Sequence, residues 1–198
     1  MVRVAIRTAR KTITMPATHV ALLRGINVGK AKRVAMTDLR KLFETLGCRE
    51  VQTLQNSGNV VFEAPPGMRG SFGSTVEAAL TTKAGVTSRT TIIATKDLAR
   101  ILEDNPLPEV AKDPSRALVA LPRTPAVARK LKMLGKTDWS PDRFAMGPRA
   151  AYLWCAEGVL RSKLWGACNT LVGDEVTTRS WRTMQSLSEL ASAANSSK

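Results

Sequence analysis

The order of the predicted elements constrains this chain more than any other feature of its sequence. From Met15 onward, apolar runs and helical spacings follow the order strand, helix, strand, strand, helix, strand, and that order then occurs a second time. Two successive units of this kind are typical of a duplicated ferredoxin-like fold. The sequence therefore predicts an α/β (α+β) protein with two ferredoxin-like β-α-β-β-α-β halves, 15–96 and 97–191, with mixed or antiparallel sheets and extra helices.

Capping patterns predict where the helices begin. A Ser or Thr side chain at an N-cap accepts a hydrogen bond from one of the first free backbone N–H groups of a helix. Ser74 has a glutamate three residues later, which is the spacing of a capping box, and Thr124 is followed by a proline at the first helical position. The predicted N-caps are Thr37, Ser74, Thr95, Thr124 and Ser162.

Both ends of the chain are predicted to lie outside the fold. Residues 1–14 are basic, contain no acidic residue and have no apolar face, so we expect a disordered leader or a misassigned start before Met15. The segment 192–198, rich in Ser, Ala and Asn, is predicted to be a disordered tail. No apolar run reaches the roughly 18 residues that a membrane helix needs, and the leader is too short for a secretory signal. We therefore expect a cytoplasmic protein.

The net charge and the reactive side chains limit the range of functions that the sequence supports. The net charge is +14, which favours polyanionic partners or acidic small molecules, although a solvated basic surface explains it equally well. Cys48, Cys155 and Cys168 form neither a C-x-x-C pair nor an even set, as expected of reduced, packed thiols. The single histidine, His19, opens an apolar strand. No metal site, catalytic triad or cofactor is predicted.

A polar loop follows the first predicted strand. It runs from Arg24 to Lys30 and exposes backbone N–H groups close to a helix N-terminus, where anions are favoured. A right-handed crossover places this loop at the same end of the sheet as the predicted turn 56–59. The predicted anion-binding residues are Arg24, Gly25, Asn27, Gly29, Lys30, Asn56, Ser57 and Asn59. The alternative is that these glycines and amides only satisfy two tight turns.

The loop differs from a nucleotide-hydrolysing P-loop. Its two glycines are one residue too close together, and Ala31 stands where the magnesium-binding hydroxyl belongs. A second basic cluster is predicted at one end of the second sheet, with two helix N-termini beside it. Its members are Arg161, Lys163, Arg179 and Arg182. A solvated basic face with Trp181 as a core anchor is the alternative.

Four motifs carry a resemblance to a known family. They are 21–29 (ALLRGINVG), 56–62 (NSGNVVF), 161–164 (RSKL) and 178–183 (TRSWRT). Together they resemble the bacterial domain-of-unknown-function family 1697, over roughly 18–191. The resemblance implies an α/β fold of ferredoxin-like halves and no known activity. Lys30, Asn56 and Ser180 depart from the residues usual in the family, which are Gly, Gln and Asn.

The polar motifs indicate that the protein binds an oxyanion, and they do not point to a particular reaction. They contain Gly, Asn, Ser, Arg and Lys but no paired carboxylates, so general acid–base chemistry has no obvious agent. The leading interpretation is an anion-binding domain for a phosphorylated or nucleotide-like ligand. One alternative is a nucleic-acid-binding module that binds weakly and without sequence preference, because only Phe62 offers a base-stacking ring on the first and third strands. Another is a protein-interaction or dimerisation domain.

Overall fold

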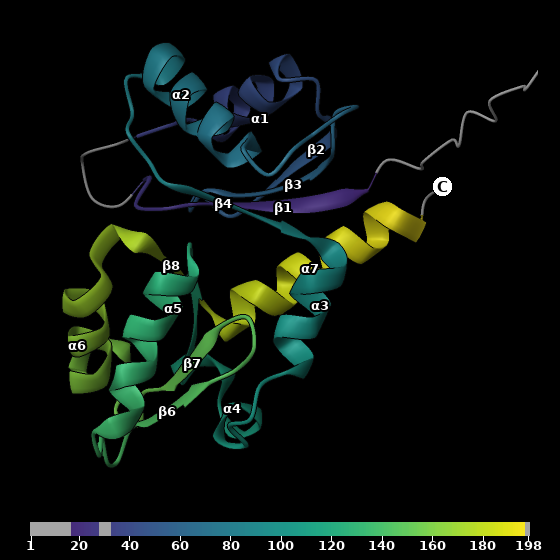
Figure 1. Cartoon of the computed structure of the whole chain (residues 1–198). Helices are drawn as coiled ribbons and strands as arrows, with labels where there is room; N and C mark the ends of the chain where they lie inside the picture. Colours follow the sequence, from purple (N-terminus) through teal and green to yellow (C-terminus); the bar gives the residue numbers. More distant parts are fainter. Residues whose placement is uncertain (1–16, 28–32, 197–198) are drawn as a thin grey trace, which may run out of the picture.

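The computed structural model describes residues 17–27 and 33–196 (Figure 1). The predicted leader and three residues of the predicted loop, Val28, Gly29 and Lys30, lie outside this part of the chain. The strands are β1 (Thr18–Leu23), β2 (Arg49–Leu54), β3 (Asn59–Glu63), β4 (Thr90–Ala94), β5 (Ala117–Pro122), β6 (Arg143–Met146), β7 (Ala151–Trp154) and β8 (Val176–Ser180). The α-helices are α1 (Met36–Thr45), α2 (Phe72–Ala84), α3 (Thr95–Glu103), α4 (Glu109–Lys112), α5 (Pro125–Lys132), α6 (Lys163–Val172) and α7 (Trp181–Ser196). Short 3₁₀ turns are η1 (Pro114–Arg116), η2 (Met133–Lys136), η3 (Val159–Arg161) and η4 (Gly173–Glu175).

The two halves repeat one sheet topology. The first sheet has the order β2-β3-β1-β4 and the second the order β6-β7-β5-β8, and every neighbouring pair is antiparallel. This is the ferredoxin-like arrangement with the first and third strands of each unit at the centre. The predicted duplicated fold is confirmed.

Each sheet has one face covered by its own helices and one face turned toward the other half (Figure 1). Strand side chains alternate between the faces, so Ala21 and Leu23 of β1 pack with α1 and α2, whereas Val20 and Leu22 enter a different core. That core also holds Val119 of β5 together with apolar residues of α3 and α7. The two halves therefore share one continuous core, in which each fully buried Val or Leu contributes about 1.5–3 kcal/mol.

Two of the predicted helix starts are confirmed by their hydrogen bonds. Thr124 accepts from the Val127 N–H at 3.3 Å, with Pro125 at the first helical position, and Ser162 accepts from the Trp165 N–H at 2.9 Å. Because the two side chains supply acceptors at these helix ends, the local sequence is sufficient to place them.

The other three predicted caps are wrong. The cap position of α1 is Ala35 and that of α3 is Ala94, so Thr37 and Thr95 lie inside their helices. The Thr95 hydroxyl donates to the Thr18 carbonyl, which joins α3 to β1. Helix α2 begins at Phe72, ahead of Ser74, so the predicted capping box does not form.

The C-terminal helix is longer than predicted. Helix α7 continues to Ser196, past the expected end of the fold at Ala191, and Ala191 itself is fully buried in the shared core. Its inner face, with Met184 and Leu187, lies against both sheets, which gives this helix tertiary support along its length. Within the described residues, no helix is long and apolar enough to cross a membrane.

Candidate functional site

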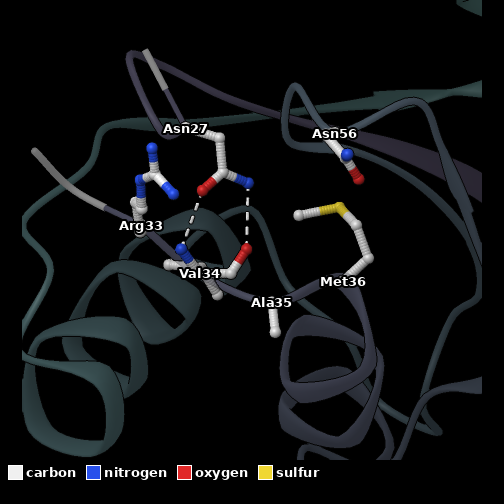
Figure 2. Close-up of a pocket in the computed structure, with 6 residues that line it drawn as sticks. All are labelled: Asn27, Arg33, Val34, Ala35, Met36 and Asn56. Carbon is white, nitrogen blue, oxygen red and sulfur yellow. Dashed lines mark hydrogen bonds between the residues drawn. The ribbon is translucent and has the colours of Figure 1, made fainter. Parts of the chain in front are cut away.

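The predicted loop and the predicted turn meet at a pocket, as the topology requires. The pocket has a volume of about 450 Å³ and lies where β1 leads into α1, beside the β2–β3 turn. Figure 2 shows Arg33 on one side of Asn27, with Asn56 and Met36 on the other. Its lining residues are Asn27, Arg33, Val34, Ala35, Met36 and Asn56. Of the predicted anion-binding residues, two therefore line one cavity.

Asn27 has a structural role in this pocket. Its side-chain Nδ2 donates to the Val34 carbonyl at 2.9 Å, and its Oδ1 accepts from the Val34 N–H at 2.8 Å. These two hydrogen bonds close the loop on itself, as the dashed lines in Figure 2 show. Asn27 also has a φ of 57°, a left-handed conformation that Asn tolerates better than most residues. Its amide therefore shapes the pocket wall, and one Nδ2–H remains beyond the hydrogen bond to Val34.

The N-terminus of α1 opens at the pocket without a side-chain cap. Ala35 occupies the cap position and has no side-chain acceptor. The N–H groups of Asp38 and Leu39 donate to the Ala35 carbonyl, at 3.1 and 3.0 Å. The N–H groups of Met36 and Thr37 have no partner among the described residues. Unpaired N–H groups at this end of a helix carry partial positive charge.

The β2–β3 turn packs closely on the loop. A side chain at Gly58, which has a φ of +69°, would place its Cβ 2.7 Å from Ile26 Cγ1 and 2.9 Å from Leu23 Cβ. The Leu23 N–H also donates to the Gly58 carbonyl at 2.8 Å. Glycine is thus required at this position for both its backbone conformation and its lack of a side chain. This contact holds the exposed Asn56 over the pocket.

Arg24, a predicted anion-binding residue, does not line the pocket, and its side chain is directed to the second half. Its Nε donates to the Asp174 carboxylate at 3.0 Å, its Nη1 donates to the Val176 carbonyl, and its Nη2 donates to Asn169 Oδ1 at 3.3 Å. All three nitrogens are therefore used on the second half. The adjacent Gly25 is exposed and is not among the lining residues.

Arg123 is the counterpart of Arg24 in the second half. Each arginine directly follows the first strand of its half, and each reaches the first residue of the other half's fourth strand. Arg123 Nη1 donates to Glu77 Oε1 at 2.8 Å and to the Thr90 carbonyl at 3.5 Å. The equivalence extends to the fourth strands themselves, because the hydroxyls of Thr91 and Thr177 lie 2.9 Å apart. We call these the reciprocal arginine contacts.

Glu77 completes one of the reciprocal arginine contacts. Burial opposes its ionisation, but the hydrogen bond from the Thr90 N–H and the Arg123 guanidinium together hold the pKa of this carboxyl below its ordinary value. The glutamate that the sequence places in a capping box thus joins the two halves.

Arg179 of β8 crosses from the second half to the walls of the candidate pocket. Its Nε donates to Asn59 Oδ1 at 2.6 Å, and its Nη2 donates to the carbonyls of Leu23 and Ser57 at 2.7 and 3.2 Å. Burial, and to a lesser degree the nearby Arg24 cation, lowers the pKa of Arg179 to about 10. The guanidinium remains charged at neutral pH and joins the end of β1 to the β2–β3 turn.

Ser57 and Asn59 are likewise structural. Asn59 is fully buried, and its Nδ2 donates to the Leu54 carbonyl at 3.2 Å and to Ser57 Oγ at 2.8 Å. With Arg179 on its Oδ1, the Asn59 amide has no group left for a ligand. Only Asn56 in this turn remains exposed with its amide available.

The predicted second basic cluster divides between different places. Arg161 and Lys163 line a pocket of about 240 Å³ beside Asp142. Arg179 points into the junction between the halves, and Arg182 acts electrostatically on Asp113. The prediction that all four cations converge is wrong, because strand topology fixes where backbones end but not the direction of long side chains.

The remaining reactive side chains are packed. All three cysteines are free and buried, and burial raises the pKa of Cys48 to about 12 and that of Cys168 to about 11, which opposes thiolate formation. His19 stacks on Phe62 with ring centroids 5.9 Å apart, and its Nδ1 donates to the Ala17 carbonyl. Within the described residues no three His, Cys, Asp or Glu side chains are grouped to hold a metal ion.

Comparison with known proteins agrees with the fold. The family model described as "Protein of unknown function (DUF1697)" matches residues 17–152, more than half of the chain. The chain belongs to this family. Conserved bacterial protein SP0830 from Streptococcus pneumoniae has a similar structure, with a TM-score of 0.69 at 18% sequence identity. The match covers 88% of this chain and 98% of that chain, and at this identity it shows the fold alone. No protein with a curated description matches the sequence.

Sequence reasoning did not assign two residues to this site: Arg33, and Arg179, which it placed in the second basic cluster. Arg33 lines the pocket directly before α1, and its position as the last cation ahead of the first helix was the available signal. Arg179 supports the pocket walls from the far half, and nothing in its local sequence identifies Leu23 and Ser57 as its partners.

Proposed function

We propose that the protein binds a phosphorylated or nucleotide-like small molecule in the pocket at the N-terminus of α1. The observation that carries this proposal is the uncapped start of α1, where the N–H groups of Met36 and Thr37 open beside Arg33 and Asn56. Backbone N–H groups, one guanidinium and one amide are the donors that an oxyanion requires.

A second pocket extends the site along α1. It has a volume of about 380 Å³ and shares Arg33, Val34 and Ala35 with the first. Lys41 and Lys83 line its far side, and Lys83 Nζ donates to the Thr45 hydroxyl at 3.0 Å. A ligand with a phosphate at the helix end and a larger body would find room in this second pocket. Asp38 also lines it, so the anionic group is expected on the Asn56 side.

The sheets offer little to the nucleic-acid alternative. RNA-recognition domains of ferredoxin-like topology stack bases on the sheet face that their helices leave open. In this protein those faces of both sheets, with Val20, Leu22, Val61 and Tyr152, are buried in the core shared with α3 and α7. The remaining support for nucleic acid is the net charge of +14, which favours salt-sensitive binding without sequence preference.

The test uses a pair of matched substitutions at corresponding helix starts. Ala35→Asp would place a carboxylate over the N–H groups of Met36 and Thr37, which have no partner among the described residues. The carboxylate would cap the helix and occupy the place of the anion. Thr124→Asp adds the same charge at the start of α5, where a capping side chain is already present. Thermal unfolding is measured with inorganic phosphate, pyrophosphate and ADP, since a ligand that binds only the folded state raises Tm.

We expect at least one of these probes to raise the Tm of the unmodified protein and of Thr124→Asp. Ala35→Asp should lose that response while its Tm without ligand stays equal or rises. An unchanged response in Ala35→Asp would overturn the proposed site. Oligonucleotide binding that falls steeply with salt and ignores Ala35→Asp, without any response to the phosphate probes, would favour the alternative.

A further inference from the structure

A groove on the second half lies far from the candidate pocket in sequence and is built differently. It runs between β6 and the end of α5 with the following η2, and its volume is about 410 Å³. Met133, Phe144 and Met146 contribute apolar side chains to it, and 52% of the Met133 surface is exposed. Polarizable, flexible Met side chains beside an aromatic ring are suited to receiving apolar groups of varied shape.

Three cations surround these apolar side chains. Arg129, Lys132 and Lys136 line the same groove, and all three are exposed. Among the described residues no carboxylate forms an ion pair with any of them. Their place at the end of α5 complements the helix dipole, which accounts for their sign. The helix dipole does not provide these three cations with an anionic partner.

The backbone of β6 provides a third feature. This strand is at the end of the second sheet, and among the described strands it pairs with β7 alone. The Gly147 N–H donates to the Ala150 carbonyl at 2.9 Å, and in an antiparallel pair hydrogen-bonded and non-hydrogen-bonded positions alternate. Phe144 and Met146 are therefore at positions whose N–H and C=O groups point away from β7, toward the open edge. The same two residues contribute side chains to the groove.

We propose that this groove binds an extended acidic peptide that adds to β6 as a further strand, with apolar and acidic side chains together on the face that meets the groove. The open N–H and C=O groups of β6 would pair with the peptide backbone, and every second peptide side chain would enter the groove. The acidic side chains would meet Arg129, Lys132 and Lys136.

Charge and geometry together select this partner. A second copy of a chain with a net charge of +14 would bring like charge to a cationic groove. An anionic membrane or a nucleic acid would neutralise the cations but would leave the edge of β6 unpaired. A peptide that supplies backbone, acid and apolar groups together uses all three features.

The probe is a fluorescein-labelled ten-residue peptide in which Ser occupies every second position and Leu and Asp share the others, so that Leu and Asp lie on one face of an extended strand. Its control has the same composition in three blocks, with the Ser residues first, then the Asp residues and then the Leu residues. Fluorescence anisotropy should show that the alternating peptide binds about tenfold more tightly, because only its apolar side chains have the period of a strand. Equal affinities for the two peptides would overturn the proposal.

Charge reversal tests the contribution of the cations. Lys132→Glu/Lys136→Glu should weaken binding about tenfold or more, since opposing charges at an interface are replaced by like charges. The control is Lys96→Glu/Arg100→Glu on α3, which makes the same change in net charge at the same spacing on exposed positions. If both double variants lose affinity equally, the peptide binds by net charge alone and the proposed groove is wrong.

A proline on the edge separates strand addition from simple contact. Met146→Pro removes the outward N–H of β6 without removing a hydrogen bond to β7, whereas Met146→Ala removes only the side chain. Met146→Pro should bind about fivefold more weakly than Met146→Ala, with matching far-UV circular dichroism. Equal binding by the two variants would contradict strand addition. Self-association, or binding of phosphatidylglycerol vesicles or oligonucleotides without binding of the peptide, would assign the groove to another partner.

Discussion

The two halves have one topology but make different use of the same positions. After its first strand the first half has the long connection 24–35 and an uncapped α1, whereas the second half passes from β5 to a capped α5 through Arg123 and Thr124 alone. A long connection leaves room for a pocket, and a short capped turn closes that end of the sheet. The comparison shows how a duplicated fold keeps its framework while the segment after the first strand differs, and the candidate small-molecule pocket lies at this position in the first copy.

The fourth strands differ in a similar way. Ile93 pairs with Val20 in the first half, and Arg179 pairs with Val119 at the matching register in the second. Ile93 belongs to the shared core, whereas Arg179 hydrogen-bonds to the pocket walls of the other half. One copy thus contributes apolar burial at this position, and the other contributes a polar connection between the halves.

Substitution at this matched pair should give the largest difference in stability. Arg179→Met leaves the Leu23 carbonyl and the Asn59 amide without their donor, and unsatisfied groups of this kind cost about 1–3 kcal/mol each. We expect a loss of about 3 kcal/mol, against about 1 kcal/mol for Ile93→Val. Urea denaturation measures both. Similar losses would mean that Arg179 acts only by packing.

Substitutions in the reciprocal arginine contacts should give the second-largest difference in stability. Arg123 pairs with a Glu77 side chain that is 16% exposed, while Arg24 pairs with an Asp174 side chain that is 81% exposed. Arg123→Ala should cost about 2 kcal/mol and Arg24→Ala about 1 kcal/mol, because exposed ion pairs contribute little and a partly buried carboxylate loses more. Arg24→Ala should also leave any thermal response to phosphate intact. If Arg24→Ala loses the thermal response to phosphate while its stability is unchanged, Arg24 takes part in ligand binding.

Substitutions at the two helix starts should change the free energy of unfolding by smaller amounts and in opposite directions. Thr124→Ala removes a capping hydrogen bond and should lower the free energy of unfolding by about 1 kcal/mol. Ala35→Ser adds a capping side chain to α1 and should raise it by up to about 1 kcal/mol. The two midpoints in urea should therefore move in opposite directions. If Ala35→Ser destabilises the fold, the start of α1 is satisfied in another way.

The smallest expected effect is a change in pH dependence at Glu77. Its pKa in the folded state lies below the ordinary value of 4.5, so its contribution to stability is present above pH 4.5 and is lost as the pH falls through the folded-state pKa. Glu77→Gln should therefore lose less stability than the unmodified protein on acidification below pH 4.5. Parallel profiles of stability against pH for the two proteins would show that this carboxylate is not selectively stabilised by folding.

The fold was predictable because its signals are local and repeated. Apolar runs such as Val20–Leu23 and Ala117–Leu121, with caps such as Thr124 and Ser162, establish the element order that specifies the topology. The prediction that the first loop meets the β2–β3 turn followed from that topology and is confirmed at the pocket.

The side-chain assignments were less predictable because they depend on partners distant in sequence. In the sequence, Arg24 resembles a ligand-binding cation, but the fold brings Asp174 and Val176 beside it. Glu77 likewise resembles a capping residue in the sequence, but the fold pairs it with Arg123. The duplication aligns these residues, yet it leaves no visible internal sequence identity to reveal them. Asn56 kept its predicted place because an exposed turn residue has few competing partners.

The position of α7 has a consequence for how the chain is made. Met184 and Leu187 of this helix complete the core that both sheets share, although every strand precedes the helix in the sequence. During synthesis the inner faces of both sheets therefore leave the ribosome before their cover does. Until α7 packs on them, the apolar inner faces of both sheets stay exposed, and exposed apolar surface of this kind is prone to aggregation.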